Sequence, residues 1–78
     1  LIDHIIAHRE GRERQILAAL DEAADTVAGL TARIYADIDP HLHPAAARNV
    51  LAHIIDLVGR GKVVAEDGLS RTSRFRRR

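Results

Sequence analysis

Four of the five histidines stand in two closely spaced pairs, and histidine is the residue type of this chain best suited to metal binding. His4 and His8 are four residues apart, so on a helix they would share a face and could supply two metal ligands. A zinc site needs a third and a fourth ligand with supporting hydrogen bonds, and the chain has no cysteine to supply them. His41 and His43, separated by one residue at the predicted start of a helix, would add only a weak further pair of ligands. We therefore expect these histidines at a surface or an interface, and no metal site.

His53 is the remaining histidine and the only candidate general base within a strongly apolar helical segment. It stands beside Leu51 and Ile54, and no serine, cysteine or carboxylate at a suitable spacing accompanies it as a nucleophile or an orienting group. We expect its ring to pack against the helix stripe, with one nitrogen bonded to backbone or to a side chain. The sequence therefore predicts that this chain has no catalytic residue of its own.

Charge is distributed unevenly along the chain. The last eight residues contain no acidic side chain, whereas the first seventy contain seven basic and eleven acidic ones. The five arginines of this basic tail could contact the phosphates of a nucleic acid with salt-sensitive affinity: Arg71, Arg74, Arg76, Arg77 and Arg78. A disordered, solubilising end is the other interpretation.

Apolar residues at spacings of three and four predict three helices. The first covers about residues 1–24 and contains a central stretch without large apolar side chains. The second covers residues 27–36, with Thr26 as its N-cap, and Asp39-Pro40 stops it. The third covers residues 44–58 and ends at a pair of glycines.

After Gly61 the pattern alternates, which predicts strands. Residues 62–65 form a first strand, Asp67-Gly68 a hairpin turn, and residues 69–75 a returning strand; residues 25–27 could add a third. This order gives a mainly α fold with a small β wing, a winged helix-turn-helix of three helices plus a β-hairpin. The expected core comprises Ile16, Leu17, Leu20, Leu30, Ile34, Val50, Leu51, Ile54, Leu57 and Val63.

The chain resembles one family of winged helices from about residue 8 to residue 64. Three residue pairs resemble the HR-x2-RE-x2-IL signature of the winged-helix domain that ends many metallo-β-lactamase-fold hydrolases: His8-Arg9, Arg12-Glu13 and Ile16-Leu17. The later helices and the first wing strand match at Thr26-Val27, Leu30, Ile34-Tyr35, Leu42, Ala46, Asn49-Val50, Ala52-His53, Leu57 and Gly61-Lys62-Val63. One departure is Gly29, where the family leads us to expect a glutamate that would complete a capping box with Thr26.

The resemblance implies an accessory module of a zinc-dependent hydrolase. The family's zinc ligands form an HxHxDH cluster in a preceding domain, and this chain lacks that motif. The module would serve interdomain docking, substrate-cleft closure or dimerisation. The alternative is a DNA-binding winged helix of a transcription regulator. Its third helix would then have to read bases, yet it carries only Arg48, Asn49 and His53 against Asp56.

These considerations predict two parts and two interaction surfaces. Residues 1–70 would form the winged-helix domain, with residues 1–7 ending a helix or linker from an absent N-terminal hydrolase domain, and residues 71–78 would form the basic tail. The domain's partners would be that hydrolase domain or a second copy of the chain, with residues 1–6 facing outward. The docking candidates are Ile5, Ile6, His8, Arg9, Arg12 and Glu13.

The cellular setting is predicted from what the sequence lacks. It has no apolar stretch long enough to span a membrane, no signal-peptide pattern and no cysteine. We therefore expect a cytoplasmic protein without a membrane partner.

Overall fold

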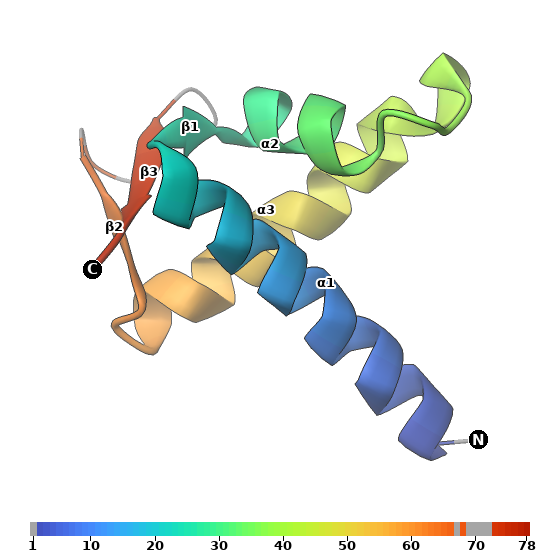
Figure 1. Ribbon diagram of the computed structural model, residues 1–78, viewed down its shortest axis with the longest axis horizontal. Helices are drawn as coiled ribbons and strands as arrows, with labels where there is room; N and C mark the ends of the chain where they lie inside the picture. Colours follow the sequence, from blue (N-terminus) through green and yellow to red (C-terminus); the bar gives the residue numbers. More distant parts are fainter. Residues whose placement is uncertain (1, 67, 69–72) are drawn as a thin grey trace.

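The computed structural model describes residues 2–66, 68 and 73–78, and for residues 2–9 it describes the backbone alone. These residues form a mainly helical domain with a small antiparallel sheet at one end (Figure 1). The winged-helix fold class is thus confirmed. The elements in chain order are α1 (Ile2–Glu22), β1 (Asp25–Thr26), α2 (Val27–Ile34), the short 3-10 helix η1 (Pro40–Leu42), α3 (His43–Gly59), β2 (Val63–Ala65) and β3 (Arg74–Arg77).

The start of α2 is capped by two side chains that precede it. Thr26 Oγ1 accepts a hydrogen bond from the Gly29 amide at 3.0 Å, as an N-cap threonine should. The amide of Thr26 itself donates to Asp25 Oδ1 at 2.7 Å, which is the bond that a glutamate at position 29 would make in a capping box. A Cβ at position 29 would collide with the Asp25 carboxylate. Asp25 therefore replaces the expected glutamate, and Gly29 leaves the space that it needs.

The connection from α2 to α3 contains a short helix, η1, that was not predicted from the sequence. Helix α2 ends at Ile34 rather than near residue 36, because the amide of Ile38 turns back to the Tyr35 carbonyl at 3.2 Å. Asp39 then caps η1 by accepting from the His41 amide at 2.9 Å. Pro44 stands in the first turn of α3, where its missing N–H costs nothing. Among the described helices, none combines the length and hydropathy that a membrane span requires.

The sheet has the order β1-β3-β2, so the last strand in the chain is the central one. Phe75 pairs with Asp25 on one side and with Ala65 on the other, and it is fully buried. Residues 74–77, assigned to the basic tail in the prediction that divides the chain at residue 70, thus pair with both other strands of this sheet. The returning strand, expected at 69–75, is observed at Arg74–Arg77, and residues 69–72 lie outside the described residues.

The core lies where the three helices and the sheet meet. Of the ten residues predicted for it, three are only half-buried and pack against its edge, namely Leu17, Ile34 and Leu51. The other seven are buried: Ile16, Leu20, Leu30, Val50, Ile54, Leu57 and Val63. Six further buried residues were not predicted from the sequence, the last two of them polar: Val27, Tyr35, Ala46, Phe75, Thr31 and Ser73.

Candidate docking and phosphate-binding surfaces

Arg12 lies at the junction of α1 with α2. Its guanidinium stacks over the ring of Tyr35 at 4.3 Å from the centroid, and its Nη1 donates to Gln15 Oε1 at 2.7 Å. Tyr35 is buried, and its hydroxyl accepts from Asn49 Nδ2 of α3 at 3.4 Å. Arg12, predicted as a docking residue, therefore contacts its own domain and links α1 through Tyr35 to both other long helices.

Glu13 has a similar role on the neighbouring side of α1. Its carboxylate accepts a hydrogen bond from Arg60, the residue that follows α3, and Arg60 also contacts Asp56 at 2.8 Å. The bond from Glu13, with the nearby charge of Asp56, raises the pKa of Arg60 above its ordinary value. Arg12 and Glu13 together form what we call the α1 clamp, since they fix this helix to the rest of the domain just before Ile16, the first buried residue among the helix residues whose side chains are described.

The other docking candidates precede the α1 clamp. The side chains of Ile5, Ile6, His8 and Arg9 lie outside the described residues, as does the predicted outward orientation of residues 1–6. The backbone here continues as regular helix. Figure 1 shows this part of α1 diverging from α3 and running away from the sheet toward the N-terminus.

A groove between α2 and α3 was not predicted from the sequence. It encloses about 510 Å³ and is lined by Val27, Ala28, Pro44, Ala47, Arg48 and Leu51. Its lining explains why Leu51 is only half-buried although it lies on the apolar stripe of α3. The small side chains Ala28 and Ala47 are the signal that could have indicated it, because they leave space between two packed helices.

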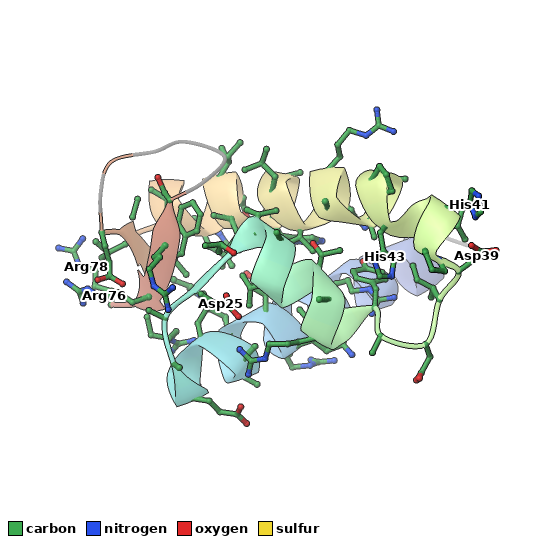
Figure 2. All side chains as sticks on the ribbon, turned by 90° about the horizontal axis from the view of Figure 1, so that it is seen from above. Asp25, Asp39, His41, His43, Arg76 and Arg78 are labelled. Atoms are coloured by element: carbon green, nitrogen blue, oxygen red, sulfur yellow. The ribbon has the colours of Figure 1, made fainter. Side chains whose placement is uncertain are left out.

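The later histidines do not gather into a site. Asp39 accepts hydrogen bonds from the amide and, at 2.9 Å, from the ring of His41, and these bonds lower the pKa of Asp39 below its ordinary value. Figure 2 shows this pair at the corner before α3, with His43 lying apart from it. Across the described residues, no three histidine, aspartate or glutamate side chains come together to hold a metal ion. His53 lines a small depression of about 160 Å³ with Asn49, Ala52 and Asp56.

The arginines near the C-terminus divide between the two faces of β3. Arg77 faces α1 and lies 3.5 Å from Asp21, and Arg74 donates to the Ala24 carbonyl at 3.0 Å. Arg76 and Arg78 are exposed and extend from the end of the domain in Figure 2. Arg71 lies outside the described residues. The register of β3 thus places Arg74, Arg76 and Arg78 on one face of the central strand, which an unstructured tail would not do.

Comparison with known proteins identifies a family and a similar solved structure. The family model described as "Beta-lactamase associated winged helix domain" matches residues 26–72. The crystal structure of a beta-lactamase domain protein from Burkholderia ambifaria is similar in fold, with a TM-score of 0.82 and 26% sequence identity. That similarity covers 99% of this chain and 23% of that protein, so the chain spans less than a quarter of the related protein's length.

Proposed function

Because the chain belongs to the family of β-lactamase-associated winged-helix domains, we propose that it is the accessory module of a metal-dependent, metallo-β-lactamase-fold hydrolase. The related protein from Burkholderia ambifaria is named for a beta-lactamase domain, and most of its length lies outside the part matched here. In this proposal the hydrolase domain binds the zinc and performs the reaction. The described residues of this chain offer no ligand set that would fit a metal.

The proposed docking element is the first half of α1. The helix has 21 residues, about 31 Å at the usual rise, yet within the described part of the chain its buried residues begin at Ile16. An isolated helical stretch of this length is marginal in water, and Gly11 weakens it by a further ~1 kcal/mol. The apolar residues Ile2, Ile5 and Ile6 would gain a surface to pack on if the hydrolase domain lay against this half.

The α1 clamp has a defined part in this proposal. The contacts of Arg12 with Tyr35 and of Glu13 with Arg60 hold α1 on the domain immediately after the docking half. They would set the direction in which that half leaves the domain, and so the angle between this module and the hydrolase. The charged pairs would act on orientation, while Ile5 and Ile6 would contribute the apolar contact. Closure of a substrate cleft and contact between two copies are further roles that the same surface could serve.

Hydrogen exchange tests the docking proposal directly. We expect the amides of residues 2–9 to exchange rapidly in the 78-residue chain and to become protected when the hydrolase domain encoded by the same gene is present. Ile5→Asp with Ile6→Asp should abolish that protection, whereas Ala18→Asp, on an exposed position of the same helix, should preserve it. Equal exchange in both samples would contradict docking through α1. A reading frame without an HxHxDH domain before this chain would contradict the accessory role itself.

A further inference from the structure

One face of the wing carries basic side chains that the docking proposal does not use. Side chains alternate along a strand, and on β3 Phe75 is fully buried and Arg77 reaches Asp21 of α1. Arg74 and Arg76 therefore point to the opposite, outer face. Arg78 continues this alternation, because its amide donates to the Lys62 carbonyl at 3.1 Å and keeps the chain in register.

The outer face is poorly neutralised. In the described part of the chain, neither Arg76 nor Arg78 forms an ion pair, and the one bond recorded for the Arg76 side chain is a 3.4 Å contact to the next carbonyl. Lys62 is exposed beside Arg78, and the partner of Arg74 is a neutral carbonyl, not an acidic side chain. Glu66, opposite Arg74, is the described acidic residue nearest in register. We call Lys62, Arg74, Arg76 and Arg78 the basic wing face.

We propose that the basic wing face binds the phosphate backbone of duplex nucleic acid without reading its bases. Alternate residues of a strand are about 6.8 Å apart, so Arg74, Arg76 and Arg78 form a row that can follow successive phosphates. Guanidinium groups suit phosphate oxygens in charge and geometry. The row lies on a sheet that Phe75 anchors in the core, so it is presented by a fixed support and not by a flexible tail.

The surroundings of the row favour a duplex over other anionic partners. Single strands are held mainly by stacking of bases on aromatic rings, and both aromatic residues of this chain, Tyr35 and Phe75, are buried. A membrane surface would require exposed apolar side chains next to the charges, and on this face the described apolar side chain, Val64, is half-buried.

Base reading has no support on the neighbouring helix. The exposed positions of α3 include Arg48, Ala52, Ile55 and Asp56, which offer few donors to base edges. The contact should therefore depend on charge and be insensitive to sequence.

Fluorescence anisotropy with labelled DNA duplexes tests this proposal on the 78-residue chain. We expect equal affinity for two duplexes of unrelated sequence, weaker binding to either single strand, and a steep loss of affinity between about 50 and 200 mM salt. Arg76→Ala with Arg78→Ala should lower the affinity at least about tenfold and reduce the salt slope by about 2. Arg76→Lys with Arg78→Lys should retain most of the binding, because the charge remains.

The matched control is Arg14→Ala with Arg48→Ala, which removes the same charge from exposed positions away from the wing. It should bind almost as the unchanged chain does, and circular dichroism should show all variants folded. An equal loss in the control would reduce the effect to net charge and overturn the proposal. Sequence-selective binding, absence of binding at low salt, or binding to phosphatidylserine vesicles in place of the duplex would also overturn it. None of these outcomes bears on docking through α1, which hydrogen exchange measures separately.

Discussion

At the start of α2, Asp25 takes the capping role that a glutamate at position 29 would otherwise have, and the helix remains capped. A capping box normally closes with a side chain three residues after the N-cap, and this chain closes it with the residue before, Asp25. Arg33 supports that arrangement, since it lies 3.3 Å from Asp25 and 2.8 Å from Glu22. The consequence is that positions 25 and 29 are coupled, because only one of them can place a carboxylate at the Thr26 amide.

This coupling predicts a sign change in a double-mutant cycle. Gly29→Glu alone should lower the free energy of unfolding, because its side chain displaces the Asp25 carboxylate. Asp25→Ala alone should also lower it, by about 0.5–2 kcal/mol, through loss of the bond to Thr26. The double variant should recover much of the loss, since the introduced glutamate can then complete the box. Urea denaturation of the four proteins measures the coupling, and strictly additive losses would contradict this explanation.

At the scale of elements, β3 decides whether the wing belongs to the domain. Its central place in the sheet means that β1 and β2 have no other partner in the described residues. Phe75 fills the space beneath it and is among the largest fully buried side chains. The stability of a chain of this size is roughly 4–12 kcal/mol, so the loss of one such anchor is a large fraction of the total.

Phe75→Ala should therefore cost about 3–5 kcal/mol and leave the chain partly or wholly unfolded at 37 °C. Ending the chain after residue 70 should have at least that effect, because it removes the whole of β3. Arg76→Ala, on the outer face of the same strand, is the control and should change stability little. Thermal melts followed by far-ultraviolet circular dichroism report all three. A cooperative melt of the shortened chain at the temperature of the full one would contradict this prediction and support a domain boundary at residue 70.

The sequence predicts the helices and the first two strands well and misplaces the last strand, and the reason is physical. Periodic apolar residues mark α1, α2 and α3, since a buried helix face needs them at spacings of three and four. Strand β3 carries one buried residue among arginines, so its composition resembles a solvated tail. Local alternation predicts a returning strand that ends at Phe75, whereas its continuation to Arg77 depends on long-range pairing with Val63 and Val64, which the local pattern does not contain.

The same limit applies to the α1 clamp. Arg12 and Glu13 stand in a polar stretch, and from the sequence alone this stretch is expected to face away from the domain's own core. Their partners, Tyr35 and Arg60, lie on other elements far along the chain, so spacing along one helix could not indicate them. The groove between α2 and α3 is likewise a property of how two helices pack, not of either helix by itself.

For the whole molecule, the family and the absence of a nucleophile–base pair in the sequence predict that the isolated chain is inert. We expect no turnover of esters, thioesters, β-lactams or single-stranded RNA, with or without added zinc. Each assay should be run beside the His53→Ala variant, which serves to distinguish a true activity from a contaminant. Turnover that persists through purification and disappears in that variant would contradict the prediction.

The stacking of Arg12 on Tyr35 also gives the molecule an optical reporter. Tyr35 is the single tyrosine, and the chain has no tryptophan, so its near-ultraviolet emission comes almost entirely from one ring. That ring is covered by the guanidinium of α1 and hydrogen-bonded to Asn49 of α3. Its spectrum therefore responds to any shift of the first helix against the other two, and it does so without an added label. A titration with a hydrolase domain or a duplex could be followed in this signal, which would report an event that moves α1 or α3 against Tyr35.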